Sequence, residues 1–560
     1  MTDIYGIMSL AGSALLTQQK AINVTGNNIA NVNTPGYSRQ KLLLETQSPV
    51  QSSIGLMGNG VEADSVERVY DRFLGVQINN ESESLGRWQA RKEGLEIAEV
   101  IFNESGEFGL SQSINEFWTS WQNLANDPSG YNERVVVQAK SEMMAGAFNR
   151  LYADLQNAQQ EFDASIEGAV ADINRLSQQI AELNQKIMEV EASGSTANDY
   201  RDRRDLVLKE LAGLIDVNTF EDDTGRVTIS VGSGQTLVEG SSSCNLTTQV
   251  NGFGFNDVAW IGQDGTTVNI TANIANGKLS GWLQARDVDN RGYLRQLDVL
   301  AETLMERVNN LHQGGWGLDG STGNDFLTGL AAAAGNMDSL LTITAEPGGT
   351  GNIRITLVGG GTAGAETVTT DPVTGDIQIS IEDGVSTGGQ IAAALQAHSA
   401  INSVVAAAPA VAWDLSAGTN TSALVGGSSA EAIQVNPAIS NNLDLIAASS
   451  TSAGVPGDNA QAIAMANLQH SLTMNGSSST FEDYYNSLVS KVGGDMQNAE
   501  AYFNHQSDMV IQLENRRESI SGVSLDEEMI NLIKFQTAYD AAAKLISTAD
   551  ELLQTVLNMV

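Results

Sequence analysis

Apolar residues recur at alternating steps of three and four over three stretches of the chain, the period of a helix that packs along one stripe. One stretch covers residues 165–190, and the other two lie at the chain ends, in residues 4–32 and 525–560. The internal stripe is typical of a coiled-coil seam. Its positions are Ile166, Ala169, Ile173, Leu176, Ile180, Leu183, Ile187 and Val190.

The two terminal helices have predictable inner boundaries. We expect the first helix to end before Pro35, because proline holds its predecessor in extended geometry. Residues 34–37, Thr-Pro-Gly-Tyr, fit a type II turn with Gly36 at the position of positive φ. The last helix is predicted to begin near Leu525, because Ser524 and Glu527 have the spacing of a capping box.

The composition changes along the chain in a nested order. Helical patterns cover residues 1–215, strand patterns 216–280, and helix returns at about 281–312. Residues 331–430 are strand-like and rich in Gly, Ala, Thr and Ser, and 436–560 are helical again. This order predicts a multidomain α + β fold, in which both chain ends form a long α-helical coiled-coil or bundle layer and β-rich domains are inserted outside it.

Four domains follow from this division. They are a terminal helical domain of residues 1–65 plus 515–560, a helical bundle domain of 66–215 plus 281–330 plus 436–514, a β-rich domain of 216–280, and a variable β domain of 331–435 rich in Gly, Ala and Thr.

The terminal stripes are candidates for an interface between subunits rather than only an internal core. They lie where chains normally fray, and in residues 1–32 only Asp3 and Lys20 are charged. Gly6, Gly12 and Gly26 each cost a helix about 1 kcal/mol, so the first helix is marginal alone and is expected to order on assembly.

We therefore predict that the terminal helices pair with each other and pack against neighbouring copies. The predicted interface positions are Ile4, Met8, Ala11, Leu15, Ile22, Ile29 and Val32 in the first helix and Leu525, Met529, Leu532, Tyr539, Ile546, Leu553 and Leu557 in the last. The last helix has a second apolar flank, so its apolar face is wider than one partner would cover. That flank consists of Ile533, Leu545, Ala549, Leu552, Val556 and Met559.

The charge of the chain disfavours two classes of partner. The 560 residues carry 67 Asp and Glu against 29 Lys and Arg, a formal net charge of −38. Nucleic acids and anionic membrane surfaces are bound by clustered Lys and Arg, so we expect neither as a partner. Residues 1–25 lack the basic start of a Sec signal peptide, and the apolar stretch 401–413 is too short to span a bilayer.

No pattern of catalytic or metal-binding residues is apparent. His312, His398, His470 and His505 are far apart and lack ligand spacing, so each is expected to be a surface or packing residue. Cys244 is the only cysteine, which excludes an internal disulfide framework, and we expect it to be an inert small residue. We therefore predict no enzyme activity, no cofactor and no metal.

Two further motifs are interpreted as structural. Residues 359–364 match G-x-G-x-x-G, but a strand pattern follows where a phosphate site needs a helix, so we expect a hairpin loop. The charges of residues 199–205 sum to zero, and this run is predicted to be a solvated helix face with i,i+4 pairs.

Both chain ends resemble a known family. Asn27 and Asn28, followed by Ala-Asn-Val-Asn-Thr-Pro-Gly-Tyr-Ser-Arg at 30–39, resemble the N-terminal signature of flagellar rod, hook and hook-associated proteins. Residues 517–529, with Asn531, Leu532, Ile533, Gln536, Ala538 and Tyr539, resemble the C-terminal segment of the hook-associated proteins of the hook–filament junction. The signature turn is formed by Asn33, Thr34, Pro35, Gly36 and Tyr37.

The resemblance implies a structural role without catalysis. Members are exported unfolded through the flagellar type III apparatus, without a Sec signal, and assemble outside the cell with their terminal helices as an inner tube. The implied partners are further copies of the chain, hook protein, a second junction protein leading to flagellin, and an export chaperone that binds the C-terminal helix. The chaperone residues carried over are Leu545, Ile546, Leu552, Leu553 and Val556.

Other functions remain as alternatives. Flagellin is disfavoured because its N-terminus lacks the signature turn. Flagellar hook protein or another axial protein remains an alternative. From a different class, the chain could be a secreted acidic adhesin with a helical stalk. An enzyme acting from the β region is a third alternative, without a catalytic constellation to support it.

Overall fold

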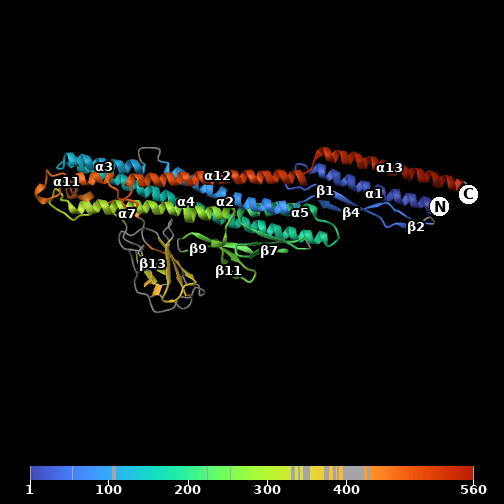
Figure 1. The fold of residues 1–560 in the computed structure, drawn as a ribbon, viewed down its shortest axis with the longest axis horizontal. Helices are drawn as coiled ribbons and strands as arrows, with labels where there is room; N and C mark the ends of the chain where they lie inside the picture. The colour runs from blue at the N-terminus through green and yellow to red at the C-terminus, as the bar shows by residue number, and fades with distance from the viewer. Residues whose placement is uncertain are drawn as a thin grey trace.

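The computed structural model shows a long rod of helices from which β domains project on one side, with both chain termini at the same end of the rod (Figure 1). It describes residues 2–52, 55–103, 109–222, 225–251, 254–329, 334–337, 341–344, 353–370, 377–382, 386, 390–391, 393–394, 422–425 and 429–558.

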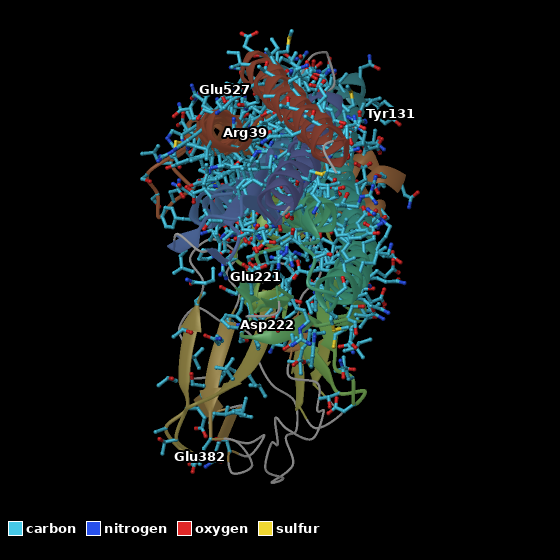
Figure 2. All side chains as sticks on the ribbon, turned by 90° about the vertical axis from the view of Figure 1, so that its right-hand side faces the viewer. Arg39, Tyr131, Glu221, Asp222, Glu382 and Glu527 are labelled. Carbon is cyan, nitrogen blue, oxygen red and sulfur yellow. The ribbon has the colours of Figure 1, made fainter. Side chains whose placement is uncertain are left out.

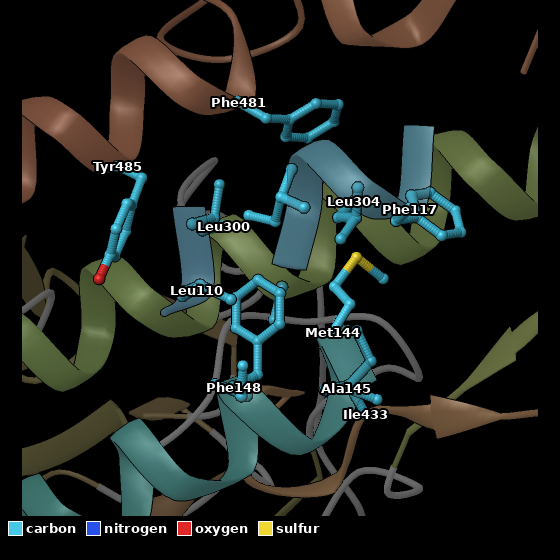
Figure 3. Packing of buried hydrophobic residues seen from close by; sticks show 14 of the residues in the cluster. Leu110, Phe117, Met144, Ala145, Phe148, Leu300, Leu304, Ile433, Phe481 and Tyr485 are labelled. Atoms are coloured by element: carbon cyan, nitrogen blue, oxygen red, sulfur yellow. The ribbon is translucent and has the colours of Figure 1, made fainter. Parts of the chain in front are cut away.

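The body of the rod is a helical bundle. Its long members are α2 (Arg72–Phe102), α3 (Leu110–Asn126), α4 (Tyr131–Glu191), α7 (Arg291–Gly314) and α12 (Phe481–Ser521). Side chains from α3, α4, α7 and α12 meet in one apolar cluster, which includes Phe117, Phe148 and Phe481 (Figure 3). Shorter elements complete it: α9 (Ser429–Ala432), α10 (Pro437–Asn441), η4 (Leu443–Leu445), η5 (Ser452–Gly454), α11 (Ala460–Asn467) and η6 (Leu468–His470).

The apolar stripe of residues 165–190 lies in the second half of α4. Seven of its eight predicted positions are buried and Val190 is half-buried, so the stripe itself is confirmed. It packs on α5 (Asn198–Leu214) and on β strands rather than on a second long helix. The coiled-coil interpretation was therefore wrong about the partner, because an apolar stripe packs equally well on the face of a sheet.

The first β region covers α5 and α4. Strands β5 (Asn218–Glu221), β6 (Val227–Val231), β7 (Gln235–Glu239) and β8 (Ser242–Ser243) form one antiparallel sheet. Strands β9 (Asn245–Val250), β10 (Asn256–Ile261) and β11 (Thr267–Asn269) form the next. The chain then returns through η1 (Thr271–Asn273), α6 (Gly277–Gln284) and the π-helical turn η2 (Ala285–Asn290) into α7.

The second β region lies farther from the rod (Figure 1). Its four-stranded sheet has the order β16-β17-β15-β18, formed by β15 (Ile353–Gly359), β16 (Thr367–Thr370), β17 (Ile377–Ile381) and β18 (Ser422–Val425). Strands β13 (Ala334–Met337) and β14 (Leu341–Thr344) pair beside it, and β12 (Leu327–Thr328) pairs with β19 (Gln434–Val435) where the region leaves the rod. The apolar stretch 401–413 lies outside the described residues.

The glycine-rich loop joins β15 to β16, but these strands are not neighbours. Strand β17 lies between them, pairing in parallel with β15 and antiparallel with β16. The loop is therefore a crossover and not the hairpin predicted from the sequence, because the partner of β15 arrives later in the chain.

The end of the rod that carries the termini consists of α1 (Thr2–Ala30) and α13 (Leu525–Asn558), which lie side by side and run in opposite directions (Figure 1). Strands β1 (Gln40–Thr46) and β4 (Val61–Arg68) pack on α1, with β2 (Val50–Ser52) and β3 (Gly55–Met57) at the tip. None of the described helices contains a stretch long and apolar enough to cross a membrane.

The predicted inner ends of both terminal helices are confirmed. Helix α1 ends at Ala30, before Pro35, and α13 begins at Leu525. The amide of Tyr37 donates to the carbonyl of Thr34 at 3.2 Å, and Gly36 has φ of 78°. These are the hydrogen bond and the left-handed third residue of a type II turn.

Candidate functional site: the terminal helix pair and its joint

The seam between α1 and α13 is lined by small side chains. Ala11 and Ala21 of α1 and Ala542 and Ala549 of α13 are buried. Small side chains let two helices approach closely but remove little apolar area from water. The contact between α1 and α13 therefore removes less apolar area from water than the packing of the bundle helices does.

The larger apolar residues of α1 lie beside this seam. At about 100° per residue, Ile22, Leu15 and Met8 lie about 100° to 140° around the helix from the buried Ala21. All three are half-buried, as are Ile29 and Val32, whereas the predicted position Ala11 is fully buried. The side chain of Ile4 lies outside the described part of the chain.

Helix α13 shows the same offset. Leu525 is 46% exposed, Met529 56% and Tyr539 37%, while Leu532, Ile546 and Leu553 are half-buried. Ile530 and Ile533 are exposed on other sides, so the first turns of α13 carry apolar side chains most of the way round. The side chain of Leu557 is not described.

The two stripes lie on the same side of the helix pair. The helices run in opposite directions, so an offset of the same sense on each moves both stripes to one side. The β1/β4 ribbon contacts the other side, where the Thr17 hydroxyl donates to the Val61 carbonyl at 3.3 Å and Gly60 lies against Ser13. We call this open side the apolar face, and it consists of Met8, Leu15, Ile22, Ile29, Leu525, Met529, Leu532, Tyr539 and Ile546.

Asn28 is the centre of the joint between the pair and the rod. It is 1% exposed, and its amide donates to the Gln40 carbonyl at 2.9 Å and to the Glu528 carboxylate at 3.1 Å. Its oxygen accepts from the Tyr37 hydroxyl at 2.8 Å and from the Gln40 amide at 2.9 Å. All four hydrogen-bonding positions of one buried side chain are thus used, which fixes the chain on both sides of the signature turn.

The N-terminal and C-terminal signatures bind each other at this joint. The Arg39 amide donates to the Ser521 carbonyl at 2.7 Å, and the Arg39 guanidinium pairs with Glu527 at 2.6 Å. Figure 2, which looks along the rod, shows Arg39 and Glu527 close together on the helical side, away from Glu382 in the outer sheet. The signature residues Asn33, Thr34 and Pro35 form the exposed outside of the turn.

The capping box predicted for α13 is only half formed. The Glu527 amide lies 3.5 Å from the Ser524 hydroxyl, but the Glu527 carboxylate binds Arg39 instead of returning to Ser524. An ion pair with a guanidinium is the stronger interaction for that carboxylate, and a local motif cannot reveal a partner almost 500 residues away.

The acidic residues of α5 hold the inner side of the joint. Asp202 is 6% exposed and accepts from the Ser38 amide at 2.8 Å and from Arg68 at 2.9 Å. Arg68 also binds Asp205 at 2.7 Å, and the Gln40 amide group donates to Asp199 at 2.7 Å. Burial opposes the charge of Arg68, but Asp205 and Asp202 outweigh it and raise the pKa of Arg68 above its usual value.

The arginines of the same helix point to the opposite side. Arg201 binds Glu191 at 2.7 Å and Glu221 at 2.9 Å, while the buried Arg204 binds Glu221 at 3.1 Å and the Gly225 carbonyl at 2.5 Å. Glu221 belongs to β5, in the middle of Figure 2.

The prediction of a solvated face for residues 199–205 was therefore wrong. Asp202 and Arg204 are buried, and the charges at 201, 202, 204 and 205 have partners on other elements, whereas Arg203 is exposed. A sum of charges along one helix does not show such partners. Sequence reasoning also missed Arg68 and Glu221, although the spacing of acids at 199, 202 and 205 on one side of a helix was a usable signal.

The described residues contain no group of three or more His, Cys, Asp or Glu side chains arranged to hold a metal ion. His312 is buried between the Asn324 carbonyl at 2.7 Å and the Ala447 amide at 3.0 Å, so it is a packing residue. Cys244 is buried, and burial raises the pKa of its thiol.

Three flagellar family models match parts of the chain. Residues 95–327 match the family described as flagellar hook-associated protein FlgK helical domain. Residues 8–37 match that described as flagella basal body rod protein, and residues 516–559 match the flagellar basal body rod FlgEFG protein C-terminal family.

Curated relatives named flagellar hook-associated protein 1 match along the whole chain. Those of Bacillus subtilis, Salmonella typhimurium and Escherichia coli K12 are each 27% identical, over 100%, 99% and 99% of this chain and 99% of each relative. Along its whole length the chain is similar to flagellar hook-associated protein 1, and its centre and both ends match flagellar families. It is a structural axial component of the bacterial flagellum, at the hook–filament junction.

A solved structure agrees with the fold. The flagellar hook junction protein FlgK from Burkholderia pseudomallei is 17% identical and matches with a TM-score of 0.64, over 80% of this chain and 100% of that one. The multidomain α + β architecture is thereby confirmed. The two rod-protein matches cover α1 with its signature turn, and the end of α12 with α13, which are the two halves of the joint.

Proposed function

We propose that this hook-associated protein 1 homologue builds its part of the junction by packing the apolar faces of neighbouring α1–α13 pairs together. The observation that carries the proposal is the position of the large apolar side chains, which lie beside the internal seam on an open side. A monomer gains little from this arrangement, whereas a helical assembly would bury it in every copy.

The chain acts in this role as a structural element without catalysis. Its proposed neighbours are further copies of itself, hook protein on one side and a second junction protein leading to flagellin on the other. The proposed place of action is outside the cell, after export through the flagellar apparatus without a Sec signal. The domain of residues 331–435 would face outward, since its sheet is remote from the helix pair (Figure 1).

An export chaperone is the proposed partner of the last turns of α13. Leu545 and Leu552 are exposed, but Ile546 and Leu553 are half-buried beside α1, and the side chain of Val556 is not described. A chaperone that used all of these side chains would have to bind before α13 packs on α1. Chaperone binding and pairing would then exclude each other, which suits a chain kept unassembled until export.

A double substitution on the exposed part of the apolar face tests the assembly proposal. Leu525→Ser with Met529→Ser, expressed in cells that lack the native protein, should be exported but should leave the cells without filaments and shed flagellin into the medium. Both side chains are exposed, so the monomer should keep its fold.

The matched control is Val100→Ser, which changes an apolar side chain 74% exposed on α2, away from the pair. Cells with this variant should carry normal filaments. Normal filaments on cells with the double variant would overturn the proposal, and a failure of the unchanged chain to restore filaments would overturn the function itself.

A further inference from the structure

Helix α5 has two polar sides that bind two different parts of the molecule. Asp199, Asp202 and Asp205 bind the segment that follows the signature turn and the adjoining strand β4. Arg201 and Arg204, from the other side of the helix, bind Glu221 of the first β sheet. One helix of 17 residues thus contacts both the segment that anchors the terminal pair and the first β sheet through charged groups.

Apolar packing does not span the joint in the same way. The two large apolar clusters of the rod draw their residues from the bundle helices, α5, α6 and the β strands of residues 227–270 and 327–435, and take none from α1, α13, β1 or β4. The direction of the terminal pair is therefore set at the joint chiefly by hydrogen bonds and ion pairs, which require a definite geometry, whereas apolar contacts tolerate sliding.

The polar contacts of the joint differ in burial. Asp202 and Arg68 have side chains 7% and 9% exposed, so turning the pair away from α5 would leave a buried carboxylate without its partners. The Arg39–Glu527 pair is 27% and 63% exposed and lies just after the break between α12 and α13 at residues 522–524. The first contact resists rotation, and the second orients α13 once α1 is in place.

We infer that Asp202 and Arg39 are positioning residues. Asp202 fixes the signature segment on α5, and Arg39 sets the direction of α13 through Glu527. Helix α5 thereby couples the terminal pair to the first β sheet, β5–β8. The consequence is that the angle between the inner helices and the outer domains is a property of each subunit. Only the cellular readout below rests on the proposed function.

A cross-linking measurement on the purified full chain tests the first part. Cys244 is replaced by Ala, and the contacting residues Gln40 and Asp199 are replaced by Cys and joined by a short bis-maleimide. The parent should cross-link efficiently, because the signature segment lies on α5.

Adding Asp202→Ala should lower the yield about threefold or more, and Asp205→Asn should have a smaller effect. Asp172→Ala is the matched control, since this exposed acid of α4 pairs only with its neighbour Arg175 in the described contacts, and its yield should equal that of the parent. An unchanged yield with Asp202→Ala, or no cross-link in the parent, would overturn the inference. Circular dichroism distinguishes release of the signature segment from unfolding of the whole chain. If Asp202→Ala unfolds the protein, the yield of Asp205→Asn still tests the inference.

A charge exchange tests the second part in cells. Arg39→Glu alone and Glu527→Arg alone should each reduce the fraction of cells with filaments severalfold while export stays normal, because each leaves two like charges facing each other. The double variant Arg39→Glu with Glu527→Arg should restore filaments, which loss of folding would not allow. Full filament counts for both single variants, or no restoration by the double one, would contradict the role of Arg39. The unchanged chain must restore filaments first; its failure would speak against the proposed function and leave the cross-linking result standing.

Discussion

The bundle and the terminal pair are both built of long helices, but they are held together by opposite means. The bundle buries Trp118, Trp121, Phe117, Phe148 and Phe326 completely. The terminal pair buries alanines and leaves its isoleucines, leucines and methionines half or fully exposed. The core of the bundle is complete within one chain, whereas the terminal pair leaves large apolar side chains for the neighbouring copies that we propose.

The same spacing of apolar residues, at alternating steps of three and four, has two different roles in this molecule. In α4 the apolar stripe coincides with the buried side, because α5 and the β strands cover it. In α1 and α13 the stripe is rotated away from the internal seam. This uncovered stripe is the feature on which the proposed assembly rests.

The largest expected effect comes from opening the bundle core. Trp121→Ala should lower the free energy of unfolding by about 3–5 kcal/mol, because it removes a fully buried ring that contacts Phe117 and Phe326. Denaturant unfolding followed by circular dichroism measures this. Val100→Ala is the exposed control, and a cost below about 1 kcal/mol for Trp121→Ala would show that the bundle is not the stable half.

A change at the seam should act only on the pair. Ala542→Leu inserts a large side chain where Ala542 is 5% exposed and should destabilise the contact of α13 with α1 by about 1–3 kcal/mol. Hydrogen exchange should then become faster in α13 but not in α3. Gln536→Leu, an exposed position on the same helix, is the control. Faster exchange in both helices would mean that the two regions unfold together.

The bundle should also show a pH dependence of its own. Burial raises the pKa of Glu83 on α2 to about 7, although the carboxylate accepts the Val217 amide at 3.0 Å. A carboxyl with a raised pKa binds a proton more tightly in the folded state, so its contribution to stability falls as the pH rises from about 4.5 to about 7.

The variant Glu83→Gln should therefore be more stable than the parent at pH 8 and should flatten this part of the stability curve, measured by urea unfolding at several pH values. Glu93→Gln, an exposed change on the same helix, should leave the curve unaltered. A curve for Glu83→Gln that parallels that of the parent would contradict the assignment.

The smallest effect on the free chain is expected from the apolar face. Leu525→Ser with Met529→Ser should change the free energy of unfolding by less than about 0.5 kcal/mol, because both side chains already face solvent. Thermal unfolding of the purified chain measures this. A clear destabilisation would show that the face has a partner within the chain and would remove the contrast with the bundle.

The sequence predicted the features that local physics dictates. The end of α1 before Pro35 followed from that proline, the start of α13 at Leu525 from the spacing of Ser524 and Glu527, and the turn from a glycine at the one position that needs positive φ. These signals lie within a few residues of the structure that they determine. The assembly and chaperone residues remain predictions.

Contacts between distant residues could not be predicted in this way. The seam of α1 and α13 buries small alanines, which give only a weak apolar signal, so the sequence pattern pointed to the larger residues beside them. Arg68 meets Asp202 across 134 residues of sequence, and β17 enters between β15 and β16 from farther along the chain. Pairings of this kind depend on the whole topology and leave no trace in spacing or composition.

The contact of Asn28 with Glu528 joins residues 500 positions apart, so it also bears on the order in which parts of the chain fold. The entropy cost of closing so long a loop is small only after the bundle has brought its ends together. We therefore expect a chain truncated before residue 525 to fold its bundle without forming this contact. Under the assembly proposed above, the joint would exclude such truncated chains, because it forms only when the start of the last helix is present.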